Sequence, residues 1–168
     1  RQMCIRDRTW TAGGVNAGTS ALRFVGTDAA TFTDATNNYY DIEFAKTALV
    51  VMSIGAGGVT ATNDLTVNHD SQLNNNTIDV QGNLIILKGV GTGSAIIRMS
   101  GAGAQTVSGT TGQYIPNLDI ASPGGVTFLG GADIGIGGSF TVTSGTLDAT
   151  TNNTVVNLGT FANTGNFN

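Results

Sequence analysis

The chain has 168 residues, of which 40% are hydrophobic and only 11% carry a charge, and its formal net charge is −4. This composition argues against disorder, because disordered chains are rich in charge and poor in β-branched residues. The scattered basic residues after position 8 offer no footprint for nucleic acid, and no apolar run approaches the roughly eighteen residues of a membrane-spanning helix, so we expect neither nucleic acid as a partner nor membrane insertion by this segment.

The first eight residues differ in composition from the rest of the chain. They contain three of the five arginines and the only cysteine, Cys4. The segment resembles translated sequencing-adapter sequence, so we interpret residues 1–8 as an artefactual tail, with a genuine basic tail as the alternative. Without it the chain has no cysteine, which excludes disulfides and cysteine zinc sites and is compatible with bacterial secretion.

Residues 9–168 predict an all-β fold with almost no helix. Glycine recurs every few positions, so no window sustains an amphipathic helix of three turns. Apolar and polar residues alternate over short segments, which directs one side of each strand inward and the other to solvent. The expected strands, in chain order, are 21–25, 40–44, 49–54, 64–67, 77–80, 84–87, 95–99, 117–120, 126–129, 139–143 and 154–157.

A spacing of 75 residues aligns two long stretches of the chain. Gly26 aligns with Gly101 and Tyr39 with Tyr114 at this spacing. The order of matches persists to the end of the chain with small drifts, as expected when insertions fall in turns. We therefore predict two repeat copies, at about 20–93 and 94–168.

Two architectures fit this pattern, a right-handed parallel β-solenoid (β-helix) and two tandem β-sandwich domains. A sandwich of this size usually needs large core residues, and the only tryptophan, Trp10, lies beside the suspect tail. A solenoid coil is narrow, so small aliphatic residues fill it, and Asn or Thr can stack on the equivalent residue one coil later. We favour the solenoid, with about 25 residues in each coil and three coils in each repeat copy.

Two segments carry a resemblance to a known class of proteins. Residues 138–148 (GSFTVTSGTLD) and 158–168 (LGTFANTGNFN) resemble the repeat regions of large bacterial surface proteins of the autotransporter-passenger and filamentous-haemagglutinin kind. The resemblance covers nearly all of residues 20–168 and is compositional. It implies a surface-exposed stalk, and it brings no catalytic residues.

Candidate chemical groups are few. The single histidine, His69, would act as a base if Asp70 or Asp64 oriented it, but a solvated turn is the favoured interpretation. Asp41 and Glu43 share one strand face and Asp119 partly echoes them, and paired carboxylates serve glycoside hydrolysis or calcium binding. We favour outward-facing charges on an alternating strand.

Two glycine-rich stretches and the threonines also need an interpretation. Residues 130–138 contain an incomplete version of the calcium-binding nonapeptide, so we expect a turn followed by a strand. Residues 89–93 lack the lysine and helix of a phosphate site and are interpreted as the junction between copies. Ice or mineral binding would need threonines aligned on one face, and Thr66 and Thr141 do not establish such a row.

The sequence therefore predicts a structural and adhesive stalk segment of a large secreted or cell-surface bacterial protein, not an enzyme. A polysaccharide or a neighbouring cell surface is the expected partner, and no catalytic, cofactor or metal residues are assigned. The alternative is a fragment of a carbohydrate-active β-helix enzyme, of the polysaccharide lyase or glycoside hydrolase type.

Overall fold

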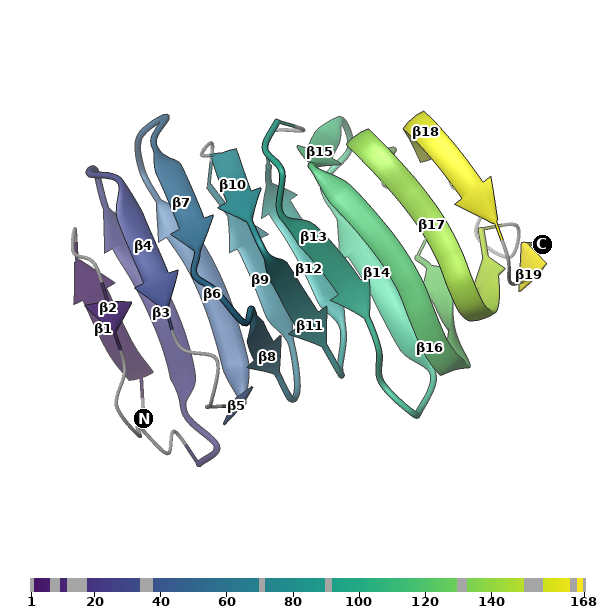
Figure 1. Cartoon of the computed structure of the whole chain (residues 1–168), viewed down its shortest axis with the longest axis horizontal. Coiled ribbons are helices and arrows are strands. Elements are labelled where there is room, and N and C mark those ends of the chain that lie inside the picture. The colour runs from purple at the N-terminus through teal and green to yellow at the C-terminus, as the bar shows by residue number, and fades with distance from the viewer. Residues whose placement is uncertain are drawn as a thin grey trace.

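The computed structural model is an all-β parallel solenoid whose coils stack along the long axis of the molecule (Figure 1). It describes residues 2–6, 10–11, 18–33, 38–69, 72–89, 92–129, 133–149, 156–163 and 166–167. Within these ranges there is no helix, and hence none that could cross a membrane. The predicted all-β class and the solenoid architecture are confirmed.

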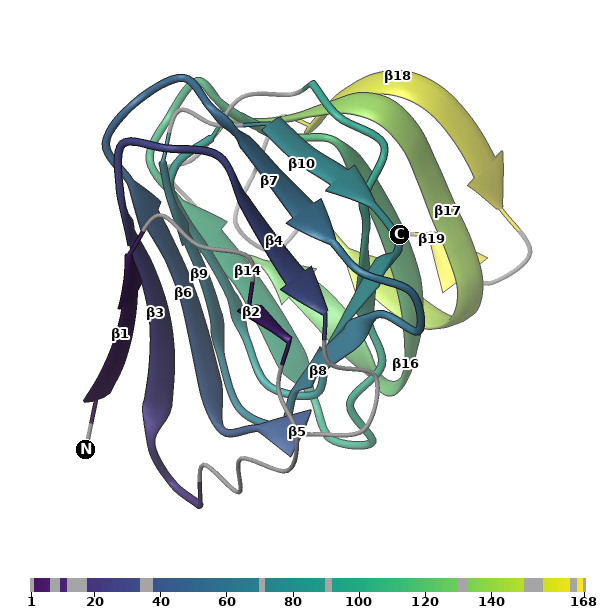
Figure 2. The ribbon, with the colours of Figure 1, turned by 60° about the vertical axis from the view of Figure 1, so that its left-hand side comes forward.

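Each coil contributes strands to three faces that surround the interior (Figure 2). Face A is the longest ladder, and six coils separate β3 from β17 along it. Its strands, in stacking order, are β1 (Gln2–Arg6), β3 (Ala21–Gly26), β6 (Asp41–Lys46), β9 (Leu65–Asn68), β12 (Leu84–Lys88), β14 (Gln105–Gly109), the last part of β16 (Asn117–Phe128), the last part of β17 (Ile134–Asp148) and β19 (Asn166–Phe167).

Face B follows face A in chain order, and face C follows face B. Face B stacks β2 (Trp10–Thr11), β4 (Ala30–Thr33), β7 (Val51–Ile54) and β10 (Gln72–Asn75). In later coils β15 (Gln113–Ile115) and the starts of β17 and β18 (Val156–Asn163) take this place. Face C stacks β5 (Asn38–Tyr39), β8 (Val59–Ala61), β11 (Thr77–Val80), β13 (Ile96–Met99), the start of β16, the middle of β17 and the later part of β18.

Every pairing between described strands is parallel, and stacked residues lie 19 to 23 positions apart. Tandem β-sandwiches, the alternative architecture, are therefore wrong, because their sheets are antiparallel. The coil is also shorter than the expected 25 residues. Leu22 lies on face A and Ile97 on face C, so a shift of 75 residues moves a strand to a different face. The division into two copies at about 20–93 and 94–168 stays a prediction.

Inward-pointing side chains of the three faces form one continuous core. Leu22, Ile42, Leu65, Leu84, Val107 and Phe128 stack on one another along face A, each in the coil after the last. The early coils also enclose aromatic rings, and the centroid of Phe24 lies 4.9 Å from that of Phe32 and 5.4 Å from that of Phe44. The core is thus wider than a column of small aliphatic residues, because several phenylalanines and Tyr39 are fully buried.

A ladder of polar side chains joins successive coils where the chain enters face A. Asp41 Oδ1 accepts the Asp64 backbone N–H at 3.2 Å, and Asp64 Oδ1 accepts the Asn83 N–H at 2.8 Å. Asn83 Oδ1 in turn accepts the Thr106 N–H at 3.0 Å. Each side chain satisfies a corner N–H of the next coil, which the strands themselves leave unpaired. The predicted stacking of Asn and Thr between coils is therefore confirmed.

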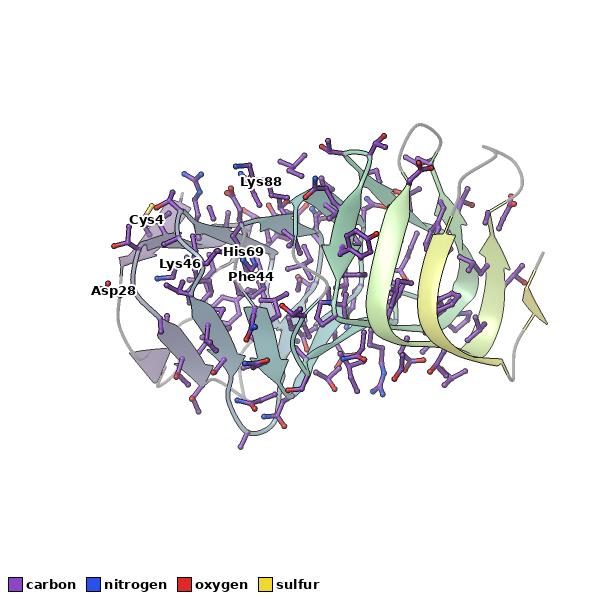
Figure 3. The ribbon with its side chains drawn as sticks, turned by 90° about the horizontal axis from the view of Figure 1, so that it is seen from above. Cys4, Asp28, Phe44, Lys46, His69 and Lys88 are labelled. Atoms are coloured by element: carbon purple, nitrogen blue, oxygen red, sulfur yellow. The ribbon has the colours of Figure 1, made fainter. Side chains whose placement is uncertain are left out.

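The first eight residues include β1, which pairs in parallel with β3. Cys4 lies in β1 and is exposed, at the end of the molecule (Figure 3). Residues 7–9 lie outside the described ranges. The interpretation of residues 1–8 as an artefactual tail stays a prediction.

Candidate functional site

Asp41 and Glu43 point outward from β6 on face A, as predicted, and both contact neighbouring coils. Glu43 Oε2 lies 2.9 Å from Nε of Arg23 in the preceding coil. Asp41 Oδ1 accepts a second hydrogen bond, at 2.9 Å, from the Asn63 side chain. Both carboxylates are half-buried and take part in coil stacking, so the structure gives this pair a structural role.

His69 differs from its prediction. Its side chain is only 1% exposed, so the expected solvated turn is wrong. The imidazole packs edge-on against Phe44, with ring centroids 5.9 Å apart, and Figure 3 shows the two side chains together in the interior beside Lys46. The apolar ring of Phe44 and the coil end at Lys88, whose carbonyl accepts the His69 N–H at 3.4 Å, enclose the histidine. Asp70, its suggested orienting partner, lies outside the described residues.

Asp64, the other suggested partner of His69, is committed to the polar ladder. Its Oδ1 accepts both the backbone N–H and the side-chain amide of Asn83, at 2.8 and 3.1 Å. Asp64 precedes β9 and His69 follows it, so the strand separates the two residues. The structure therefore does not bring Asp64 and His69 together as an acid-base pair.

Asp119 belongs to a separate cluster on the outside of face C. In consecutive coils Asp79, Arg98 and Asp119 occupy one outward column, with Thr60 before them and Thr141 after them. Arg98 Nε donates to Asp119 Oδ2 at 2.8 Å, and the Thr143 hydroxyl donates to Asp119 Oδ1 at 3.0 Å. Asp119 thus lies on a different face from Asp41 and Glu43 and does not extend that pair.

The electrostatics of this column favour the charged guanidinium. The hydrogen bond to Asp119 is the largest influence on Arg98 and raises its pKa above the ordinary value. Partial burial opposes this rise, and the charges of Asp119 and Asp79 add to it. Arg98 is therefore a permanent cation held between two carboxylates.

A shallow groove of about 620 Å³ lies beside this column. Its side chains come from three successive strands of face C, and Gly93 and Ser94 lie at one end. The side chains that line its length include Ile96, Asn117, Asp119, Ser139, Thr141 and Thr143. The strands were predicted from the sequence, but the groove was missed because it depends on which residues stack 21 or 22 positions apart.

The remaining sequence candidates are dispersed. Thr66 faces outward on face A and Thr141 on face C, so these two threonines share no row. Of residues 130–138, the first three lie outside the described ranges, and β17 begins at Ile134, in agreement with the expected strand. Residues 90–91 of the other glycine-rich stretch also lie outside them. Among the residues placed by the structure, no three His, Cys, Asp or Glu side chains gather into a metal site.

Comparisons with known proteins add no relative. No family model, no curated protein and no solved structure matches the chain. The fold and the groove are therefore the features of the molecule that bear on its function.

Proposed function

We propose that this chain is a non-catalytic stalk segment of a larger adhesive protein of the bacterial cell surface. The observation that carries the proposal is the polar ladder from Asp41 through Asp64 and Asn83 to Thr106. Side chains that bond the next coil support a rod of uniform cross-section. A stalk needs such axial continuity more than it needs a reactive centre.

The use of the acidic groups supports the same proposal. Glu43 pairs with Arg23 of the preceding coil, and Asp119 pairs with Arg98 of the preceding coil. Asp41 and Asp64 accept hydrogen bonds from the following coil. These four carboxylates all connect coils, which is the use expected in a structural element.

Secretion and surface location rest on the resemblance of residues 138–148 and 158–168 to bacterial surface repeats. The absence of cysteine after position 8 agrees with that location, since bacterial surface solenoids are held together by stacking rather than by disulfides.

A carbohydrate-active β-helix enzyme is the second candidate. The groove on face C favours it, because a carboxylate, Asp119, lies in the groove beside a cation, Arg98. Against it, Asp119 already bonds both Arg98 and Thr143.

One assay separates the two functions. The purified chain is incubated with a panel of neutral and acidic polysaccharides, and release of reducing ends and of unsaturated sugars is measured. We expect no turnover. Turnover that disappears in Asp119→Asn, or in the double variant Asp41→Asn and Glu43→Gln, would establish the enzyme and remove the stalk proposal.

A further inference from the structure

We infer that the groove on face C binds a neutral polysaccharide chain that lies along the solenoid axis. This inference rests on the proposed adhesive function and assigns a binding surface to it. The groove spans β13, the start of β16 and the middle of β17, three strands in consecutive coils.

The spacing of the polar groups suits a linear polymer of sugars. Neighbouring strands lie about 4.8 Å apart, so equivalent side chains recur at that interval along the axis. Asn117 and Ser139 form one row and Asp119 and Thr141 the adjacent row, with Thr143 beyond them. Hydroxyl, amide and carboxylate groups donate and accept hydrogen bonds, as the many hydroxyl groups of a sugar chain require.

An apolar side chain completes the surface. Ile96 precedes Asn117 in the first row and is 37% exposed, although it is a large hydrophobic residue in a strand. Sugar rings present C–H faces as well as hydroxyl edges, and an exposed aliphatic group can cover such a face. Ile96 therefore adds an apolar contact to the row of polar groups.

Charge selects a neutral ligand over an anionic one. The column beside the groove holds two carboxylates, Asp79 and Asp119, and one cation, Arg98. The ion pair with Asp119 occupies the guanidinium at 2.8 Å, and the second carboxylate leaves the column negative. Polymers of uronic acids and sulfated glycans would meet net repulsion here.

The groove is held in its binding geometry without a ligand. The Asn117 amide donates to the Ala95 carbonyl at 2.9 Å, and its oxygen accepts the Ser139 N–H at 2.8 Å. Asp119 is fixed by Arg98 and Thr143. Ordered side chains lose little entropy on binding, which favours useful affinity from a shallow surface.

The test is affinity electrophoresis of the intact chain in gels that contain galactomannan, hydroxyethyl cellulose or polygalacturonate. The double variant Ser139→Ala and Thr141→Val removes two groove hydroxyls at outward positions. The matched control, Ser108→Ala and Thr66→Val, removes the same groups from outward positions of face A. Thermal melting of each variant shows whether it is folded, and the single variants replace the double one if it is not.

We expect retardation by a neutral polysaccharide, weakened about tenfold or more in the groove variant and unchanged in the control, since two hydrogen bonds are lost. Polygalacturonate should not retard the chain. The inference is overturned if neither neutral polysaccharide retards the wild type, if the groove variant binds equally well, or if polygalacturonate binds best. Any of these leaves the stalk proposal intact, whereas turnover of a polysaccharide removes the stalk proposal independently of binding.

Discussion

The side-chain oxygen of Asn83 accepts two hydrogen bonds from Thr106 one coil later, at 3.0 Å from the backbone N–H and at 2.8 Å from the hydroxyl. The Asn83 amide also donates to Asp64 in the coil before, at 3.1 Å. One side chain therefore joins three coils, and it does so at a corner where the strands provide no partner.

Asn83→Ala should lower the free energy of unfolding by about 2–3 kcal/mol, because it removes these bonds and leaves the Thr106 N–H without its acceptor. Asn68→Ala, on the outward side of β9, is the matched control and should cost less than about 0.5 kcal/mol. Urea denaturation followed by far-ultraviolet circular dichroism measures both. Equal losses in the two variants would contradict the structural role of the ladder.

Gln105 is a buried polar residue whose side chain bonds only backbone groups. Its oxygen accepts the Gly101 N–H at 2.9 Å, and its amide donates to the carbonyls of Val80, at 2.9 Å, and Gly82. Gln105→Leu keeps the volume but leaves these groups unpaired, so we expect a loss of about 2–4 kcal/mol in the same assay. Gln81→Leu, at an exposed position, should have almost no effect. A stable Gln105→Leu protein would show that packing, and not bonding, is what this site requires.

The ion pair between Arg98 and Asp119 should contribute little to stability, because the Arg98 side chain is 42% exposed. We expect Arg98→Met to cost about 0.5–1 kcal/mol, and the cost should shrink in high salt. The folded protein raises the pKa of Arg98, so the contribution of the cation is fully present below the unfolded pKa and is lost only as the pH rises through the higher folded value. The difference between Arg98→Met and wild type should therefore stay constant from about pH 7 to about pH 10. Denaturation midpoints across this range test it, and a steep change there would contradict the assignment.

Gly145 combines a positive φ of 80° with close approach to the preceding coil. A Cβ at this position would collide with the Ser122 carbonyl oxygen. Gly112 has nearly the same φ, 78°, but open space around the Cβ position. We expect Gly112→Ala to cost about 1–2 kcal/mol, from the backbone conformation, and Gly145→Ala to cost at least about 2 kcal/mol more. Thermal melting of the two variants measures the difference, and similar melting temperatures would contradict the close stacking of these coils.

The strand positions were largely predictable because alternation identifies a half-buried strand locally. The predicted segments 21–25, 77–80 and 84–87 coincide closely with β3, β11 and β12. The strands β4 and β14 were missed, since their short apolar patterns, such as Ala-Thr-Phe-Thr, are too brief to stand out beside glycine-rich turns.

The candidate site was less predictable because it depends on coil length. Arg98 and Asp119 each occupy an outward position of a predicted strand, and only their separation of 21 residues makes them neighbours. A search at 19 to 23 residues would have aligned Asp41, Asp64, Asn83 and Thr106, whereas the 75-residue spacing compares different faces. The burial of His69 had no local signal, because its enclosure depends on Phe44 in the preceding coil.

The stacking of coils on their immediate neighbours also determines how damage spreads. Each coil touches only the coil before and the coil after it, so a defect at one level weakens two interfaces and leaves distant ones unchanged. A disruptive substitution near the centre, such as Asn83→Ala, would divide the rod into two cooperative segments that melt at different temperatures. In a surface fibre under tension, such a segmented rod could yield one section at a time and rewind when the load falls.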